Sequence, residues 1–277
     1  MDKTACNSTF AIGGVSYPKK VLDLKKICIF ECAFMLENPP IANLQNVTRK
    51  LNRTTQQKKM TREEFVKNFY LERKSLVELY LSFDKETDVS KLIVDLHLDE
   101  QKTENIRQIL NGVLRDAFYT TLLGLDGAAQ IGERQETYKI EDENGNILTG
   151  GQIEIFAWEY FHNNKFELEN SNADFIATLT YKTTKQGGRK TSAKTGYRPQ
   201  MKFDFDEMQT SGQQTFIDRE LVFPGDTVEA EIKILAIDHF ANRLSEKMQF
   251  EFREGATVIG TGIIKHIINE KLKKASR

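Results

Sequence analysis

Residues 228–234 read Val-Glu-Ala-Glu-Ile-Lys-Ile, a strict alternation of apolar and charged side chains. Alternation of this kind predicts a β-strand that buries one face and leaves the other in water. Clusters of glycine, proline and aspartate stand on either side of it, as expected of tight turns. In chain order the clusters are Gly187-Gly188-Arg189, Gly196-Tyr197-Arg198-Pro199-Gln200, Phe223-Pro224-Gly225-Asp226, Arg253-Glu254-Gly255 and Gly260-Thr261-Gly262. The sequence therefore predicts a series of half-buried strands joined by turns in this part of the chain.

The order and spacing of these clusters resemble the third, C-terminal β-barrel domain of bacterial elongation factor Tu, over about residues 173–268. The resemblance implies a six-stranded antiparallel barrel. We place this barrel at residues 171–268, behind an α+β module at residues 60–170 and ahead of a basic tail at residues 269–277. The expected fold class is therefore α+β, with a mostly helical module followed by a barrel.

In that family the domain contacts the T-stem backbone of aminoacyl-tRNA and packs against the GTPase domain and the exchange factor. The resemblance implies a set of RNA- or partner-binding residues in this chain: Arg189, Lys190, Tyr197, Arg198, Gln200, Gly260, Thr261 and Gly262. Lys190 stands where the family usually has histidine, and Ala256-Thr257 replaces a family arginine. A structural alternative is that Gly196 and Pro199 only shape a turn, with Arg198 in an internal ion pair.

Two classes of partner stay open at this point. One is tRNA or another RNA, held through its phosphate backbone by arginine forks and loop amides. The other is a protein that binds elongation factor Tu, in which case the barrel acts as an immunity protein or decoy. Acidic residues at Asp204, Asp206 and Glu207 disfavour RNA, and two of them, Asp204 and Asp206, are expected to point to one face of a strand.

A GTPase domain is not expected in this chain. Its P-loop would read G-x-x-x-x-G-K-[ST], so that backbone amides cradle the phosphates. No glycine pair is followed by lysine and then serine or threonine at that spacing, and the base-reading Asn-Lys-x-Asp segment is also missing. We expect a non-catalytic binding protein of the translation machinery that holds no nucleotide.

The region before the barrel carries helical periodicity. It predicts a helix from Thr61 to about Phe83, a strand from Leu92 to Leu98, a helix from about Asp99 to Gly127, a type I′ hairpin at Asn144-Gly145, and a helix from Gln152 to Phe161. Thr61 and Glu64 form a capping-box motif at the first helix. Residues 86–165 are similar to small uncharacterised bacterial domains, to which we attach no function.

Enzymatic activity has no positive support in the sequence. The polar residues that come nearest to a catalytic or metal site are Arg115, Asp116, Asp126 and Glu133, on or near one helix, and His97, between Asp95 and Asp99. Structural ion pairs, solvated charges and a helix stop at Asp126-Gly127 explain them more simply. No H-E-x-x-H, G-x-S-x-G or cysteine–histidine pairing is present. We therefore expect no catalytic residue, no metal and no cofactor.

The ends of the chain are basic, although the formal net charge is only −1. We interpret residues 1–59 as a basic leader that is either disordered or an upstream extension before a start at Met60. Its three cysteines (Cys6, Cys28 and Cys32) lack a fourth ligand at finger-like spacing. Lys271, Lys273, Lys274 and Arg277 form the basic tail. No apolar run reaches membrane-spanning length, so we expect a cytoplasmic bacterial protein without a membrane partner.

Overall fold

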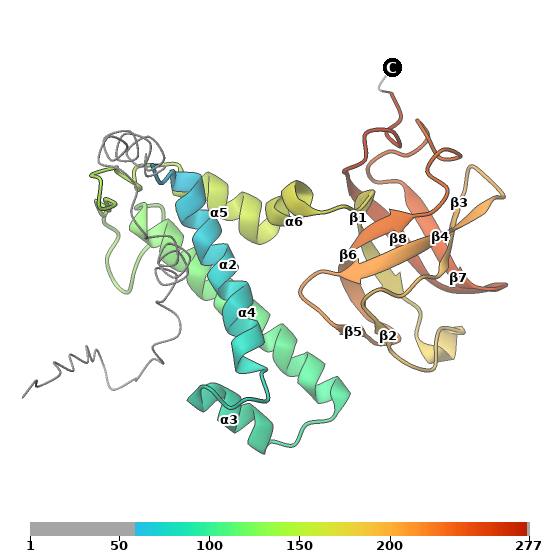
Figure 1. Ribbon diagram of the computed structural model, residues 1–277, viewed down its shortest axis with the longest axis horizontal. Coiled ribbons are helices and arrows are strands. Elements are labelled where there is room, and N and C mark those ends of the chain that lie inside the picture. The colour runs from blue at the N-terminus through green and yellow to red at the C-terminus, as the bar shows by residue number, and fades with distance from the viewer. Residues whose placement is uncertain (1–58, 276–277) are drawn as a thin grey trace, which may run out of the picture. The chain divides into compact units, whose positions relative to one another are not determined.

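The computed structural model describes residues 59–275. The leader, its three cysteines and Arg277 of the tail lie outside the described residues, so the expectations for them stay predictions. The described residues belong to one compact unit. It begins with helices and ends with a barrel (Figure 1).

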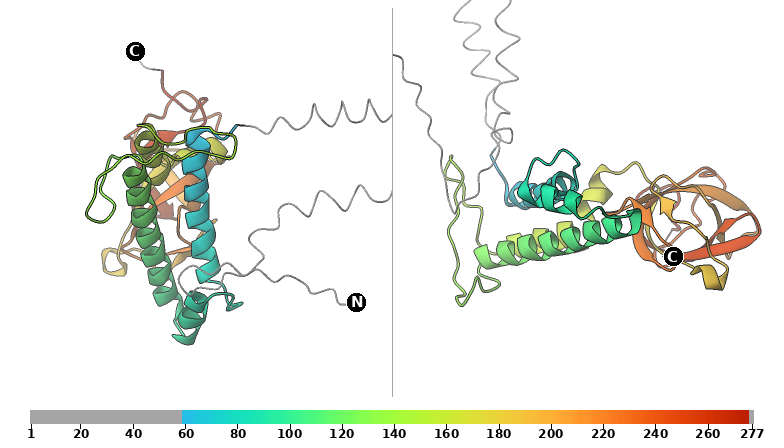
Figure 2. Two further views of the ribbon diagram at one scale, coloured as in Figure 1. Left: turned by 90° about the vertical axis from the view of Figure 1, so that its left-hand side faces the viewer. Right: turned by 90° about the horizontal axis from the view of Figure 1, so that it is seen from below.

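The helical part consists of α2 (Arg62–Tyr80), α3 (Asp88–Asp95), α4 (Glu100–Leu125), α5 (Ile153–His162) and α6 (Lys165–Asn170). Figure 2 shows α2 running alongside α4, and α5 packs against both. The core of this part contains Val66, Tyr70, Leu122, Ile153, Ala157, Tyr160 and Phe161, all buried. Residues from three helices thus share one small aromatic core.

The start of α2 confirms the predicted capping box. The Thr61 hydroxyl accepts a hydrogen bond from the Glu64 amide at 3.0 Å, and the Glu64 carboxylate accepts one from the Thr61 amide at 2.9 Å. Two amides that the first turn leaves without helical partners are satisfied in this way. The helix therefore begins at the residue that the motif indicates.

The strand predicted from Leu92 to Leu98 is wrong, because its first half belongs to α3, which ends at Asp95 and is followed by its C-cap residue Leu96. Thr87 caps the helix by accepting from the Ser90 amide at 3.0 Å. Leu92 and Leu96 lie one helical turn apart and are 68% and 60% exposed. A short apolar run fits either period, and the polar cap before the run decides between them.

Helix α4 agrees with its prediction at both ends. Asp99 caps it by accepting from the Lys102 amide at 2.8 Å, and Gly127 ends it with φ 80°. The apolar side of this helix is only partly buried: Leu122 is inaccessible, whereas Ile109 and Val113 are 57% and 61% exposed. Ile109 and Val113 therefore remain largely in contact with water.

The turn at Asn144-Gly145 is not the predicted type I′ turn. Gly145 has φ 75°, but Asn144 is not among the described residues with positive φ. The Asp142 carboxylate accepts from the amides of Asn144 and Asn146 at 2.9 Å each, and the Gly145 amide donates to the Asp142 carbonyl. Aspartate at the first turn position, followed by a left-handed glycine, selects this geometry.

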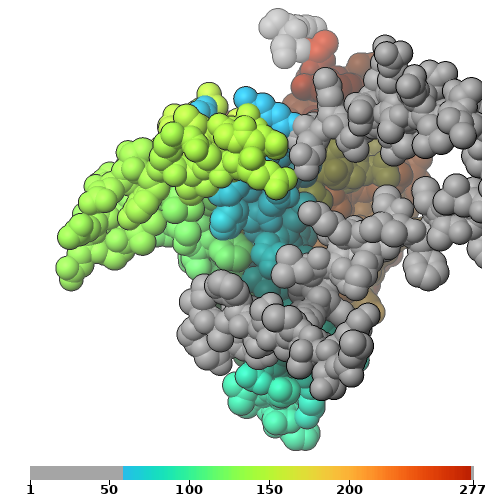
Figure 3. All heavy atoms as spheres, turned by 60° about the vertical axis from the view of Figure 1, so that its left-hand side comes forward, coloured from blue at the N-terminus to red at the C-terminus, as the bar shows by residue number. Residues whose placement is uncertain are grey.

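The loop that carries this turn lies against the helices. Figure 3 shows it in yellow-green beside α2, and the Arg62 guanidinium donates to the Gln152 side-chain oxygen at 2.9 Å. After the loop, α5 agrees with the predicted helix and buries Ile153, Ala157 and Tyr160. The short helix α6 has no counterpart in the sequence prediction.

The carboxy-terminal part is a closed six-stranded barrel, which confirms the predicted α+β fold class. Its strands are β1 (Phe175–Tyr181), β3 (Gln200–Phe203), β4 (Gln209–Phe216), β6 (Thr227–Ile234), β7 (Gln249–Glu254) and β8 (Thr257–Ile267). They pair antiparallel in the order β1-β6-β4-β3-β7-β8, and β8 closes onto β1. The short strands β2 (Ala193–Lys194) and β5 (Leu221–Val222) form a separate pair.

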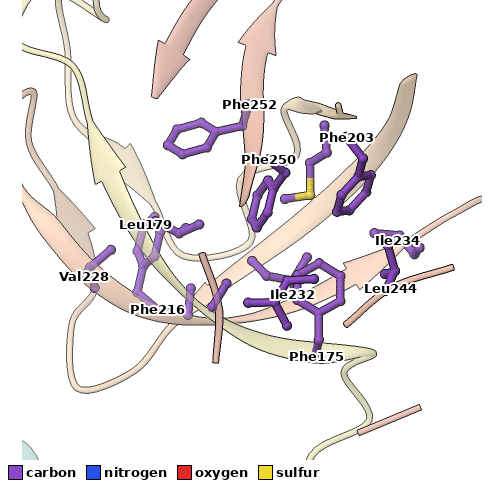
Figure 4. Close-up of a cluster of buried hydrophobic side chains, with 14 of the residues drawn as sticks. Phe175, Leu179, Phe203, Phe216, Val228, Ile232, Ile234, Leu244, Phe250 and Phe252 are labelled. Atoms are coloured by element: carbon purple, nitrogen blue, oxygen red, sulfur yellow. The ribbon is translucent and has the colours of Figure 1, made fainter. Parts of the chain in front are cut away.

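The inward face of β6 carries the alternation from which the fold was predicted. Val228, Ala230, Ile232 and Ile234 are all buried. Figure 4 shows Ile232 beside Phe175, and Phe250 and Phe252 fill the same interior from β7. A side chain added at Gly260 or Gly262 would overlap the rings of Phe252 and Phe250. The two glycines of β8 therefore make room for aromatic rings.

Asp174 joins the entry and exit of the barrel. Its carboxylate accepts from the Ile234 amide and from the Asn269 side-chain amide, both at 2.8 Å. Its backbone carbonyl accepts from the amides of Ile268 and Asn269. Beyond this point Leu272 is buried, and the Lys274 amide donates to the Leu244 carbonyl. The segment expected to be a basic tail thus packs on the barrel as far as the structure describes it.

A polar junction connects the helices to the turn after β4. The Arg73 guanidinium donates two hydrogen bonds to the Asp218 carboxylate, at 2.8 and 3.0 Å. The Asn111 side-chain amide donates to the Asp218 carbonyl, and the Glu104 carboxylate accepts from the Glu220 and Leu221 amides. Arg73 is 2% exposed, so this junction depends on a buried charge pair.

Candidate functional site

Three of the turn clusters that are far apart in sequence meet in one ionic cluster. Arg189 forms an ion pair with Glu254, and the Tyr197 hydroxyl donates to the same carboxylate at 2.5 Å. The Arg189 guanidinium also lies over the Tyr197 ring, 4.5 Å from its centroid. The clusters Gly187-Gly188-Arg189, Gly196-Tyr197 and Arg253-Glu254-Gly255 are thereby held together.

Local backbone geometry delivers Arg189 to this cluster. Thr183 caps the short 3₁₀ helix Thr184–Gln186, and Gly187 ends it with φ 83°, a conformation that favours glycine. A side chain at Gly188 would overlap the Lys182 carbonyl oxygen. The two glycines therefore turn the chain tightly enough to aim Arg189 at Tyr197 and Glu254.

This placement leaves little of Arg189 for a ligand. Its side chain is 16% exposed, and burial raises the pKa of the Tyr197 hydroxyl. Two residues predicted to bind RNA or a partner are thus brought together, but their polar groups are already satisfied within the chain. In this structure they position a loop.

The other predicted residues are spread around the barrel. Lys190 and Gln200 are exposed. Arg198 is exposed and donates to the Gln213 side-chain oxygen at 2.7 Å, a neutral partner where an internal ion pair was the alternative. Of the three predicted residues on β8, only Thr261 is exposed, because Gly260 and Gly262 are buried against aromatic rings.

A basic segment of the barrel becomes evident once the ion pairs of its lysine and arginine side chains are known. We define it as residues 182–202, which contain no aspartate or glutamate. Its cations are Lys182, Lys185, Arg189, Lys190, Lys194, Arg198 and Lys202. Arg189 pairs with Glu254 and Lys202 with Glu207. The remaining five form no ion pair with any described residue. The sequence analysis missed Lys182, Lys185 and Lys194, which a count of charge along the segment would have found.

The closed six-stranded antiparallel barrel agrees with one known family. Residues 170–268 match the elongation factor Tu C-terminal domain family. The match covers the barrel and leaves the helices α2 to α5 outside it. Domains of this family are not catalytic. The expected resemblance to elongation factor Tu is therefore confirmed for this part of the chain.

Two of the three acidic residues that disfavour RNA have partners on the elongation-factor-Tu-type barrel, Asp206 with His239 and Arg243 and Glu207 with Lys202. The prediction that Asp204 and Asp206 share a strand face is wrong, because β3 ends at Phe203. The Asp206 carboxylate accepts from the Met208 amide, His239 and Arg243, and these hydrogen bonds hold its pKa well below the usual range. The charge of Asp206 is thus committed to an internal contact.

The polar residues of the helical part have structural partners. The Asp126 carboxylate accepts from the amides of Gly150, Gly151 and Ile153, at 2.6, 2.9 and 3.1 Å. It therefore caps the start of α5. Arg115 pairs with its neighbour Asp116, and Glu133 is exposed.

His97 does not gather with carboxylates into a site. Its ring contacts the Asp95 carbonyl, whereas the Asp95 side chain pairs with Lys85 and Asp99 caps α4. Within residues 59–275, no three histidine, cysteine or acidic side chains are grouped to hold a metal ion. None of the helices described there is long and apolar enough to cross a membrane.

Proposed function

We propose that this protein is a non-catalytic binding protein whose elongation-factor-Tu-type barrel contacts RNA, in the first place tRNA, through the basic segment 182–202. The observation that carries the proposal is the set of five unpaired cations: Lys182, Lys185, Lys190, Lys194 and Arg198. All lie in or beside turns that the Arg189–Tyr197–Glu254 cluster fixes.

The chemistry of such a surface suits a phosphate backbone. Lysine and arginine that neutralise phosphates release condensed counterions, which favours binding without reading sequence. The Arg189–Tyr197–Glu254 cluster contributes by holding the segment in one conformation, so that less entropy is lost on binding. Arg189 is thus a positioning residue in this proposal, and the exposed cations make the contacts.

The test is fluorescence anisotropy of labelled bulk tRNA with the full chain at several salt concentrations. The double variant Lys190→Ala/Lys194→Ala should weaken binding about tenfold near physiological salt and flatten the salt dependence by about one to two charges. The matched control is Lys91→Ala/Lys102→Ala, which removes the same charge from lysines paired with Asp88 and Asp99. Equal affinity of the two double variants would refute the contact.

A protein partner is the second candidate, and the internal pairing of Arg189 favours it. An arginine that is 16% exposed and shared with Glu254 makes a poor RNA contact. The barrel would then occupy a protein that normally binds elongation factor Tu, as an immunity protein or decoy does. Saturable binding to the purified exchange factor of elongation factor Tu, unchanged in Lys190→Ala/Lys194→Ala, would favour this function over RNA contact. A cytoplasmic location fits both functions and stays a prediction.

A further inference from the structure

Helix α5 is apolar on two sides, and only one of them is covered. Ile153, Ala157 and Tyr160 are buried in the helical core, whereas Ile155 and Trp158 are 58% and 55% exposed. Trp158 is the only tryptophan in the chain. Large apolar side chains that share an exposed helix face mark an interaction site more often than a stable solvent surface.

A surface cavity of about 400 Å³ lies at this face. It is lined by Tyr119, Glu154, Ile155, Trp158, Glu159 and Asn163. The lining combines two aromatic rings with two carboxylates and contains no lysine or arginine. We call it the α5 cavity. It shares no residue with the basic segment of the barrel.

The tryptophan is held in place before any ligand binds. Its ring stacks on His162 with 4.8 Å between centroids, and Tyr119 meets the same imidazole edge-on at 4.6 Å. Burial and the nearby Arg115 charge lower the pKa of His162. A neutral imidazole adds no positive charge to the cavity, so the aromatic surface stays attractive to a cation. An ordered aromatic side chain of this kind loses little entropy when a partner binds.

The charge of the cavity selects the sign of its ligand. Glu159 is paired with Lys165 at 2.6 Å, but Glu154 forms no ion pair with a described residue. The Glu154 charge is felt at the cavity wall, where it adds to burial in raising the pKa of the Tyr119 hydroxyl. One uncompensated carboxylate beside a tryptophan favours a cation, and it repels the phosphates of a nucleic acid.

We infer that the α5 cavity is a docking site for a basic segment of a partner protein, which inserts an arginine side chain between Trp158 and Glu154. A guanidinium stacks on an indole ring and also pairs with a carboxylate. Its aliphatic stem would pack on Ile155. The site belongs to the helical part and does not depend on what the barrel binds.

The single tryptophan provides the measurement. Trp158 emission of the full chain is recorded while a blocked hexapeptide of alternating arginine and leucine is added, with a glutamine–leucine peptide as reference. The arginine peptide should change the emission with saturation, and the glutamine peptide should bind at least about tenfold more weakly. Equal binding of both peptides, or no saturable change with either, would overturn the inference.

Variants separate this cavity from non-specific attraction. Binding of the fluorescently labelled arginine peptide should weaken about threefold in Glu154→Gln and about tenfold or more in Trp158→Ala. Glu72→Gln is the control, because Glu72 is exposed on α2 and does not line the cavity. Circular dichroism verifies that each variant folds. Equal losses in Glu72→Gln and Glu154→Gln would overturn the site, since only overall charge would then matter.

Two other occupants are distinguishable in the same experiment. A change of Trp158 emission when tRNA is added without peptide, corrected for tRNA absorption and retained in Lys190→Ala/Lys194→Ala, would assign the cavity to nucleic acid and overturn the proposal. Sedimentation that shows a dimer of the full chain, lost in Trp158→Ala, would assign the face to a second copy and also overturn it. Binding of the arginine peptide by a monomer, with no such change of Trp158 emission on adding tRNA alone, is the expected outcome.

Discussion

The barrel and the helical part treat their apolar side chains differently. In the barrel, alternate residues of each long strand point into one closed interior, where Phe203, Phe250 and Phe252 are almost inaccessible. In the helical part, Phe83, Leu92 and Val113 are 85%, 68% and 61% exposed. A closed sheet has no free edge and completes its own core. A few helices cover only one side of each other, so their outer faces stay available to partners.

The difference is sharpest for phenylalanine, since the same change should cost much stability in the barrel and almost none in the helical part. Phe250→Ala should destabilise the protein by about 3–5 kcal/mol, because it opens a cavity in the barrel. Phe83→Ala should change the free energy of unfolding by less than about 0.5 kcal/mol, because the side chain is already in water. Urea unfolding followed by circular dichroism measures both. Similar losses for the two variants would contradict the contrast.

A second test asks whether the two parts unfold together. Arg73→Ala removes the cation of the junction and leaves the Asp218 carboxylate without it, at a cost of about 2–3 kcal/mol. Differential scanning calorimetry should show one transition for the unaltered chain and two for the variant. The double variant Arg73→Ala/Asp218→Ala should recover part of the loss, because no unpaired charge remains. Unchanged thermograms would mean that the junction does not couple the parts.

The helical part contains a smaller test of its own organisation. Asp126→Ala should cost about 1–2 kcal/mol, because three amides at the start of α5 lose their acceptor. Asp116→Ala is the matched control: this carboxylate is exposed, pairs only with Arg115, and should cost less than about 0.5 kcal/mol. Thermal denaturation compares the two variants. A larger effect at Asp116 would show that the cap is not what orders α5.

The smallest effect is expected from pH at the barrel surface. The pKa of Asp206 is lowered in the folded protein by its hydrogen bonds to Met208, His239 and Arg243. A lowered pKa stabilises the fold above the ordinary aspartate pKa of about 3.9, and this contribution is lost as the pH falls through the folded value. Asp206→Asn should therefore show a shallower fall of melting temperature below about pH 4. An identical pH profile would exclude this contribution.

The barrel could be predicted from the sequence because its pattern and its packing have the same period. Val228 to Ile234 alternate and bury every second residue, and the turn clusters mark the corners. The helical part resisted prediction where this agreement fails. Leu92 to Leu98 alternate by coincidence across the end of α3, where Leu92 and Leu96 remain exposed. Type I′ geometry was expected at Asn144, but the Asp142 side chain determines that turn.

The residues of the candidate sites could likewise be predicted from the sequence only in part. The turn clusters indicated Arg189 and Tyr197, which the structure brings together, but their shared partner Glu254 depends on strand pairing across more than fifty residues. No local pattern carries that information. Trp158 was not singled out, because its exposure depends on how α4 and α5 meet. A lone tryptophan in an otherwise apolar helix gives no sign in the sequence of which side it faces.

The contacts of Asp174 bear on how a barrel of this kind can be joined to other domains. Asp174 stands just before β1, where the chain enters the barrel, and accepts a hydrogen bond from Ile234 of β6. It also binds Ile268 and Asn269, where the chain leaves the barrel, so the two ends lie side by side. A domain whose ends adjoin can be added to another protein without spanning a gap, and it keeps its complete core wherever it is joined. The barrel can in this sense be transferred between proteins as a unit.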